Sequence, residues 1–328
     1  MAITLAQAQN LSQSKLTGYV IDEFRKSALL DMLPFDNTVK MQGGKTLAYV
    51  YNRVTTLPTA ATRALNAEYT AQEAATTQKT VNLKILGGSF SIDRVLQADE
   101  NQVTDLVQFQ LQQKIQATRA LFHDLFINGD SSSNANAFDG LDKALTDSST
   151  EVEPDAIDLS SSAKIDANWK LFLDQLRKLR AKMDGAPTLY LMNNDMFAVF
   201  QSVMDRAGIN LASKQNYGDE VLSWGGSTVM SLGDKPGASN PIIATSATGG
   251  TASAPTGGVT DIYAVRLGLD GVHGVSPEGS AIVNTYLPDF TKPGAVKTGE
   301  VEMVAAMAMK ATRSAAVLRN VRLAVPAA

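Results

Sequence analysis

The run "NQVTDLVQFQLQQKIQATRALFHDLFING", residues 101–129, carries the strongest structural signal in the sequence. Its apolar side chains recur at spacings close to four or seven residues: Val103, Val107, Leu111, Ile115, Phe122 and Phe126. Glutamine and lysine fill the other faces, so the pattern predicts a single amphipathic helix over about 99–127. Such a helix is roughly 40 Å long, which favours a role as a scaffold rod. Asn128 and Gly129 predict its C-terminal stop.

Two segments before this helix alternate in the manner of β-strands. They are "GGKTLAYVYNRV" (43–54) and "KTVNLKILGGSFSIDRV" (79–95). The 24 residues between them, 55–78, are mostly Ala and Thr with few large apolar side chains. This predicts a long hairpin whose tip needs a surface outside its own chain. A helical pattern over 17–33 precedes the hairpin and stops at Pro34.

The sequence after the rod helix changes character. Residues 130–165 are rich in Ser, Asp and Thr and are expected to be mostly loop. An amphipathic helix over 167–187, a buried strand at 188–193 and a helix capped by Asn193 or Asn194 follow, with further strands at 220–232 and 260–268 and a surface loop at 234–259. The tail, 299–323, predicts two long strands, although its alanine content leaves a helix open.

Composition excludes several classes of protein. The 328 residues are 44% hydrophobic and 19% charged, which is typical of a folded chain with a substantial core. A formal net charge of −4, with both signs interspersed, offers no basic face for sequence-specific DNA binding. The absence of cysteine excludes disulfides and thiolate chemistry. No secretory signal and no membrane-spanning run occur, so we expect a soluble protein with no membrane partner.

The histidines do not predict a catalytic or metal site. His123 and Asp124 are neighbours on a helix and diverge by about 100°, so they cannot grip one ion. A zinc helix needs histidines three or four residues apart, and the only other histidine is His273. We expect His123 to pack or hydrogen-bond at the end of the rod.

Other motif fragments are incomplete. Asp130, Ser132 and Asn134 imitate the start of a calcium loop, but Ala135 stands where glycine is required. "GGKT" (43–46) lacks the earlier glycine of a phosphate-binding loop, "GLDGVHG" (268–274) predicts a turn, and the double glycines at 87–88 and 225–226 predict bulges or sharp bends. No carboxylate pair stands in an apolar setting. We therefore expect no enzyme, no catalytic residue, no metal and no cofactor.

The order of elements resembles tailed-phage major capsid proteins of the Hong Kong 97 fold, an α+β fold. The runs that carry the resemblance are "DEFRKSALLDMLPFD" (22–36), "LGGSFSIDRVL" (86–96) and "LFINGDSSSNANAFDGL" (125–141). The resemblance implies an N-terminal arm (1–36), an extended E-loop hairpin (37–93), a peripheral domain with the spine helix (94–164), a mainly axial domain (165–290) and returning peripheral strands (291–328).

The resemblance also implies a function. The chain would self-assemble into hexamers and pentamers of an icosahedral phage head enclosing double-stranded DNA, which it would contact non-specifically. Its partners would be further copies of itself, a separate scaffolding protein and a portal. It would be located in the virion, after assembly in the host bacterial cytoplasm.

On this interpretation the hairpin tip makes the contact between subunits. The residues expected there are Leu57, Ala60, Arg63, Leu65, Glu68 and Tyr69. Some family members join subunits covalently through a lysine on this loop, but Lys45 and Lys79 match no such motif and are interpreted as solvated. One alternative is an encapsulin-like shell around an enzyme cargo. Another is a hydrolase, which would need a concave cluster of titratable side chains.

Overall fold

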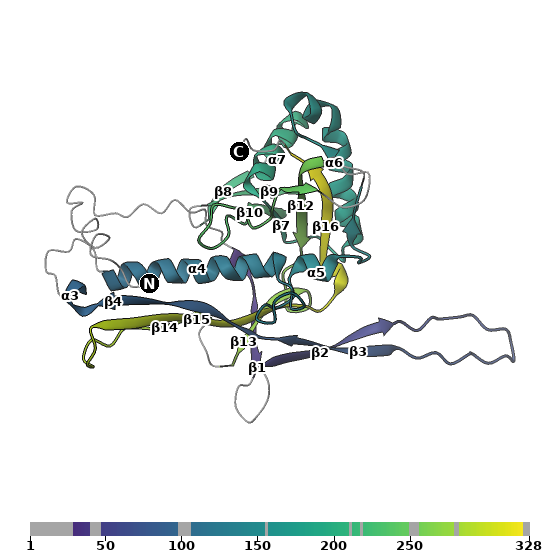
Figure 1. The fold of residues 1–328 in the computed structure, drawn as a ribbon. Helices are drawn as coiled ribbons and strands as arrows, with labels where there is room; N and C mark the ends of the chain where they lie inside the picture. The colour runs from purple at the N-terminus through teal and green to yellow at the C-terminus, as the bar shows by residue number, and fades with distance from the viewer. Residues whose placement is uncertain are drawn as a thin grey trace.

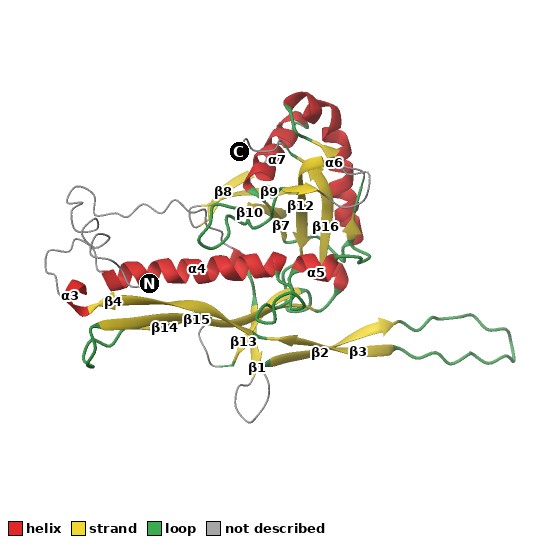
Figure 2. Ribbon diagram, viewed as in Figure 1, coloured by secondary structure: helices red, strands yellow, loops and turns green. Residues whose placement is uncertain are grey.

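The computed structural model describes residues 29–39, 47–97, 106–154, 157–209, 212–216, 219–248, 256–278 and 282–323. These residues form a long helix on a five-stranded sheet, a nine-stranded sheet with its own helices, and a projecting two-stranded hairpin (Figure 1). Helices and strands occur in both larger parts (Figure 2), as the predicted α+β class requires. The N-terminal arm expected over 1–36 falls mostly outside the described residues.

The long helix is α4 (Leu106–Asn128), which lies along the five-stranded sheet. The strands of that sheet are β1 (Phe35–Val39), β4 (Lys84–Asp93), β13 (Val272–Pro277), β14 (Asn284–Tyr286) and β15 (Val296–Met309). The helix predicted over 99–127 is confirmed from residue 106 and ends one residue later than expected. Residues 98–105, which include the predicted start, lie outside the described part, and the short helix α3 (Arg94–Gln97) precedes them.

The apolar stripe of α4 faces this sheet. Phe122, Phe126 and Ile127 share one buried core with Leu86 of β4 and Met303 of β15. Each fully buried side chain of this size stabilises the fold by about 1.5–3 kcal/mol. The helix is therefore fixed to the sheet along its apolar side, as its periodicity predicts.

Gly129 follows the last residue of α4, so the predicted C-terminal stop is confirmed, but it does not form a left-handed C-cap. Its φ is not among the positive values that a left-handed C-cap requires. Its N–H donates to the Leu125 carbonyl at 3.0 Å, and its carbonyl accepts from Gly140 at 2.8 Å. A Cβ at Gly129 would lie 2.2 Å from the Phe138 carbonyl oxygen. Glycine is required here because the returning chain passes too close for any side chain.

The nine-stranded sheet holds most of the second half of the chain. Its strands are β5 (Glu151–Val152), β6 (Ile157–Asp158), β7 (Leu189–Met192), β8 (Ala212–Asn216), β9 (Asp219–Trp224), β10 (Ser227–Ser231), β11 (Ser246–Thr248), β12 (Thr256–Val265) and β16 (Ala315–Arg322). The helices beside it are α5 (Leu141–Leu145), α6 (Ser162–Lys182), α7 (Asn194–Arg206) and the 3₁₀ turn η1 (Thr312–Ser314). The prediction that 130–165 is mostly loop missed α5, β5 and β6.

Local signals in this part are confirmed. The helix expected over 167–187 is α6, and Asn193 caps α7 by accepting a hydrogen bond from the Met196 N–H at 2.7 Å. Gly225 and Gly226, with φ of +57° and +83°, form the sharp bend between β9 and β10. The segment 234–259, expected to be a surface loop, instead buries Ile242 and Ile243 and contains β11.

Strand pairing corrects three expectations. The single strand expected from residue 79 is two strands, because β3 (Ala75–Asn82) belongs to the hairpin whereas β4 pairs with β15 beneath α4. The expectation that all of 291–328 returns to the sheet beside the long helix is wrong for β16. This strand lies between β12 and β5 in the nine-stranded sheet, where it is almost entirely buried. The mainly axial domain expected over 165–290 included β13 and β14. Both strands instead lie in the five-stranded sheet.

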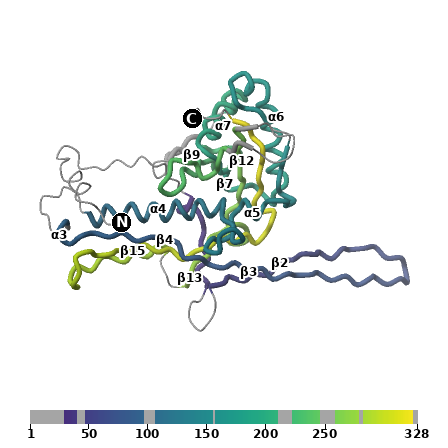
Figure 3. Tube along the Cα trace, in the orientation of Figure 1, coloured from purple at the N-terminus to yellow at the C-terminus, as the bar shows by residue number. Residues whose placement is uncertain are grey.

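The hairpin consists of β2 (Ala48–Thr56) and β3, paired antiparallel from Ala48 opposite Asn82 to Thr56 opposite Ala75. In the tube view it extends well beyond the body of the molecule (Figure 3). Residues 57–74 continue from it as an extended tip without strand pairing. No helix in the described part of the chain is both long and apolar enough to cross a membrane.

The glycine at the end of α4 gives a test of the packing. We expect Gly129→Ala to lower the free energy of unfolding by about 1–3 kcal/mol, because its methyl group would overlap two backbone oxygens. Gly88→Ala is the matched control, since its Cβ would meet only the flexible Lys114 side chain at 3.5 Å. Urea unfolding followed by circular dichroism measures both. Equal stabilities of the two variants would contradict the close approach.

Candidate assembly surface

The base of the hairpin is bonded to the turn that follows β15. The Arg53 guanidinium donates to the Lys310 carbonyl through Nε at 2.9 Å and to the Met309 carbonyl through Nη2 at 2.7 Å. Its Nη1 donates to the Thr312 hydroxyl at 3.0 Å. The Tyr51 hydroxyl also donates to the Met309 carbonyl, at 2.8 Å. These bonds hold β2 in one orientation relative to the five-stranded sheet.

A second set of contacts involves Tyr49, which lies closer to the start of β2 than Tyr51 and Arg53. The Tyr49 hydroxyl donates to Asp36 of β1 at 2.8 Å, and Lys310 lies 5.4 Å from the Tyr49 ring centroid. The buried His273 ring meets Tyr49 edge-on at 5.8 Å. Burial, reinforced by the hydrogen bond to Asp36, raises the pKa of Tyr49 above its ordinary value. Tyr49 is therefore a neutral hydrogen-bond donor at physiological pH.

Beyond Arg53 the hairpin loses its contacts with the body. All residues of β3 except Val81 are exposed, and so is every residue from Val54 to Ala74. A two-stranded hairpin with both faces in water is marginally stable by itself. The anchored base and the exposed tip together form an arm that reaches away from its own core.

The six residues predicted for the subunit contact all lie on this tip and are all exposed: Leu57, Ala60, Arg63, Leu65, Glu68 and Tyr69. Leu65 is 91% exposed and Leu57 77%, which is unusual for side chains of this kind. The structure brings one pair together, with the Arg63 guanidinium 5.5 Å from the Tyr69 ring centroid. Their contact with another subunit stays a prediction.

Few hydrogen bonds hold the tip itself. The Ala67 N–H donates to the Ala64 carbonyl at 3.2 Å, and Gln72 accepts from the Thr59 N–H at 2.9 Å. Most other backbone groups of residues 57–74 have no partner within the tip, so water or a second chain must satisfy them. An extended chain with free backbone groups and spaced apolar side chains is suited to lie on another protein surface.

The adjacent residues His123 and Asp124 have different surroundings in the structure. His123 is fully buried and meets Phe122 edge-on at 6.4 Å, so it packs as predicted. Burial, with a smaller effect of the Arg119 charge, lowers the pKa of His123 to about 3. Asp124 points elsewhere, accepting from Asn128 at 2.7 Å and pairing with Lys235 at 3.5 Å. Among the described residues no group of three His, Asp or Glu side chains could hold a metal ion.

Asp130, the first residue of the calcium-like fragment, closes a turn. Its carboxylate accepts from the Ser132 N–H at 2.9 Å and pairs with Lys143 at 2.6 Å. The hydrogen bond from Lys143 is the largest cause that lowers the pKa of Asp130. The "GGKT" run and Lys45 lie outside the described residues, and Lys79 is exposed on β3.

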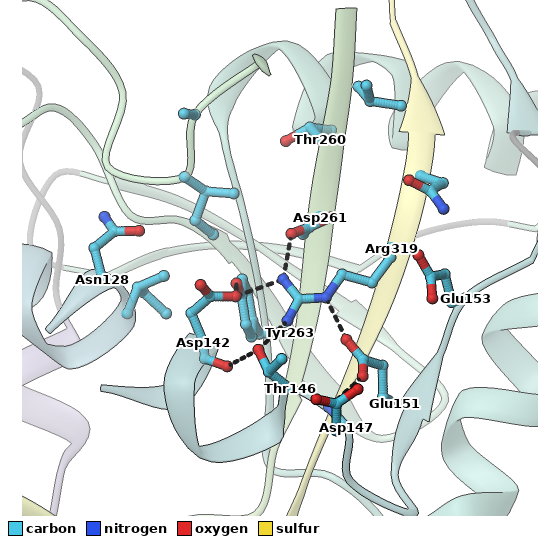
Figure 4. A pocket seen from close by; sticks show the side chains of 15 residues that line it. Asn128, Asp142, Thr146, Asp147, Glu151, Glu153, Thr260, Asp261, Tyr263 and Arg319 are labelled. Carbon is cyan, nitrogen blue, oxygen red and sulfur yellow. Dashed lines mark hydrogen bonds and ion pairs between the residues drawn. The ribbon is translucent and has the colours of Figure 1, made fainter. Parts of the chain in front are cut away.

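Sequence reasoning missed a cluster of acidic side chains around Arg319. The guanidinium lies 2.7 Å from Glu151 and Asp261 and 2.5 Å from Asp142 (Figure 4). Burial raises the pKa of Asp261 and outweighs the opposing effect of Arg319. The sequence did not reveal this partly buried carboxylate. These four residues come from three separate regions of the sequence, and no local pattern connects them.

No protein-family model and no curated protein sequence matches the chain. Solved structures resemble it over nearly its whole length. The holo-SrpI encapsulin complex from Synechococcus elongatus PCC 7942 has a TM-score of 0.63 and 16% identity, over 98% of this chain and 97% of that chain. A chain of Mycobacterium phage Bobi has a TM-score of 0.60 and 13% identity, over 100% of both chains. The capsid of Myoviridae Phage XM1 has a TM-score of 0.57 and 12% identity, over 98% of this chain and 99% of that chain.

Identities this low establish a shared fold and nothing finer. The chain has the Hong Kong 97-type capsid fold, so the resemblance stated from the sequence is confirmed at the level of fold. It extends through the hairpin as well as the two sheets, because the matches cover 98% or more of this chain.

The hairpin anchor gives a prediction for local stability. We expect Arg53→Ala to release β2 and β3, because three hydrogen bonds from a charged donor are lost. Amide hydrogen exchange in these strands should accelerate about tenfold or more, since each 1.4 kcal/mol is a factor of ten. Lys79→Ala is the matched control, because it removes a cation from β3 that makes no anchoring bond. Unchanged exchange in Arg53→Ala would show that the anchor lies elsewhere.

His123 gives a prediction for pH dependence. Its folded pKa of about 3 lies below the ordinary value of 6.5, so the folded state favours the neutral ring. The stability that neutral His123 contributes is full above pH 6.5 and is lost as the pH falls towards 3, by up to about 1.4 kcal/mol per pH unit. His123→Phe should flatten this part of the pH profile of unfolding free energy. An unchanged slope between pH 6.5 and 4.5 would contradict the assignment.

Proposed function

We propose that this chain is the structural subunit of a closed icosahedral shell, the major capsid protein of a tailed phage. Copies assemble into hexamers and pentamers, and the shell encloses double-stranded DNA. The hairpin carries this proposal: its base is bonded to the body and its tip exposes apolar side chains that its own chain does not cover. From Arg53 to Leu65 an extended chain spans up to about 40 Å, enough to reach a neighbouring subunit.

The fold likeness supports the same function. Similar solved structures over the full length include a phage capsid and an encapsulin, both named as assemblies. A heterologous contact, in which the hairpin of one copy lies on a different surface of the next, closes into a ring when the rotation permits. Rings of six and five copies then tile a shell whose interfaces bury what one subunit leaves exposed.

The electrostatics suit a container with little affinity for its contents. The formal net charge of −4 gives the wall no excess of cations, so packaged DNA meets it by non-specific contact. Packing the genome then depends on other components, which are a portal and a separate scaffolding protein. The shell assembles in the host bacterial cytoplasm and persists as the virion head.

The second candidate is an encapsulin-like compartment with a protein cargo. The full-length likeness to the holo-SrpI encapsulin complex, with a TM-score of 0.63, favours it specifically. The contents of purified particles distinguish the two functions. Nuclease-resistant double-stranded DNA of uniform length supports the phage head, whereas a stoichiometric second protein without DNA supports the compartment.

Shortening the hairpin tests the assembly function. Replacing residues 57–74 with Asn-Gly joins the paired residues Thr56 and Ala75 through a two-residue turn of the kind that hairpins favour. We expect a subunit with unchanged circular dichroism and thermal midpoint that forms no closed shells in electron micrographs. The intact chain, expressed in parallel with its scaffolding and portal proteins, is the positive control.

Two outcomes would contradict these proposals in different ways. Normal shells from the shortened chain would show that the tip is dispensable for the subunit contact. An intact chain that stays monomeric with scaffolding and portal present would remove the shell function itself. The milder double variant Leu65→Ser, Tyr69→Ser tests whether the two apolar side chains carry the contact, since both are more than half exposed in the single chain.

A further inference from the structure

Helix α6 carries an excess of positive charge on a chain that is acidic overall. It holds six basic side chains and two acidic ones, whereas the whole chain has a formal net charge of −4. No other helix in the described part of the chain holds more than two basic side chains. The basic residues of α6 are Lys164, Lys170, Arg177, Lys178, Arg180 and Lys182. Positive charge is therefore concentrated on one helix, and its position decides what it can attract.

The buried side of α6 fixes the direction in which these charges point. Phe172, Leu176 and Leu179 are buried in the core of the nine-stranded sheet, and the helix lies along the outer side of that sheet (Figure 1). The opposite side of the helix is exposed and includes every basic residue of α6 except one that is partly buried. Between the cations this side carries small residues such as Ala167 and Ala181. Over about 30 Å of helix, an extended partner can therefore approach the cations closely.

Two of the cations serve the structure of the subunit itself. Arg180 donates to the Gly225 carbonyl at 3.1 Å, and Lys182 donates to the Glu151 carbonyl. Both stand in the last turn of α6, where a cation also interacts favourably with the helix dipole. These two side chains therefore need no external partner.

Other cations on this side are available to the anions of a partner. Lys178 has no acidic partner among the described residues, and Lys170 lies 5.4 Å from the centroid of the Trp169 ring. Arg177 pairs with Asp174 at 2.8 Å, but the two side chains are 64% and 62% exposed. Exposed ion pairs of this kind are weak, so another anion can replace the aspartate. Lys170 and Lys178 stand about 12 Å apart along the helix axis, on the same exposed side.

The chemistry of this side favours one class of partner. A protein partner usually buries a central apolar side chain, yet Leu171, 47% exposed, is the only large apolar side chain that α6 exposes. Single-stranded nucleic acid stacks its bases on aromatic rings, but Trp169 packs against the core. A membrane surface takes up the apolar side of a helix, which α6 has already buried. The outside of a double helix presents phosphates, for which cations alone suffice.

We propose that the exposed side of α6 is the surface on which the subunit contacts double-stranded nucleic acid, through its phosphates and without reading its sequence. The inference deepens the proposed function and rests on it for one consequence: in the shell this side of α6 faces the interior. Each subunit offers few cations on an acidic chain, so each contact is weak and sensitive to salt. Weak contacts suit a duplex that must move along the wall when it enters and leaves.

Binding is measured on the full chain before assembly. Fluorescence anisotropy of a short labelled duplex, repeated over a series of salt concentrations, gives the affinity and its dependence on salt. For the double variant Lys170→Gln, Lys178→Gln we expect weaker binding. The slope of log affinity against log salt concentration should become shallower by about 1 for each lysine removed. Lys170→Arg, Lys178→Arg keeps both charges and should bind as the parent does.

Lys79→Gln, Lys292→Gln is the matched control. Both lysines are exposed and lie outside α6, on β3 and after β14, and the pair removes the same charge. We expect its affinity and salt dependence to equal those of the parent. Equal weakening in the two glutamine pairs would overturn the inference, because net charge rather than the α6 surface would then control binding. Failure of the parent to bind the duplex at low salt, or equal binding to a single strand or to phosphatidylserine vesicles, would also overturn it.

The orientation of α6 in the shell is tested separately. The sequence has no cysteine, so Lys178→Cys introduces a single thiol. A maleimide on a polymer too large to enter the shell should label this thiol before assembly and not after it. Labelling of closed shells would place α6 on the outer surface and overturn the consequence. An intact chain that forms no shells would refute the proposed function, whereas the affinities, measured on single chains, would still decide the contact.

Discussion

Pairing along strand β15 is the constraint on which the rest of the molecule depends. Residues 296–305 pair with β4, residues 306–309 pair with β13, and residues 300–302 also pair with β14. This single strand therefore fixes the sheet on which α4 lies. The end of β15 and the turn after it supply the carbonyls that accept from Tyr51 and Arg53, so they also fix the hairpin. Beyond that turn the chain continues as β16, so the same segment connects the two sheets.

This arrangement separates the rigid from the adaptable parts of the subunit. The buried run from Val301 to Met309 shares a core with α4 and resists deformation because protein interiors are close-packed. The hairpin beyond Arg53 has no such core, so its shape depends on what it lies against. A hairpin with a fixed base and an adaptable tip suits contacts that must form in several surroundings. The fixed base limits the positions that the tip can reach, and the adaptable tip tolerates differences between the surfaces that it contacts.

The sequence predicted the elements better than their assembly. Helices α4 and α6 and the Asn193 cap follow from local periodicity and local hydrogen bonding, which a single segment determines. The exposed tip followed from composition, since Ala and Thr offer little to bury. The sheet to which β16 belongs could not be predicted, because the apolar residues of this strand indicate burial but do not identify the strands with which it pairs. The cluster around Arg319 was invisible for a related reason: residues 142, 151, 261 and 319 meet only after both sheets have formed.

The composition of the tip suits a segment that stays exposed in the single chain until it contacts another subunit. Exposed, flat and apolar edge strands aggregate, because their free backbone groups pair with any similar strand. Here Leu57, Leu65 and Tyr69 are separated by Ala and Thr, and Arg63, Glu68 and Glu73 interrupt the apolar pattern. In the proposed shell each contact made by such a tip would be weak, so a misplaced subunit would dissociate readily, whereas a closed shell would repeat the contact through every subunit. Under the proposed function, stability would then belong to the closed assembly rather than to any pair of chains, and a tip with so few large side chains would suffice to build it.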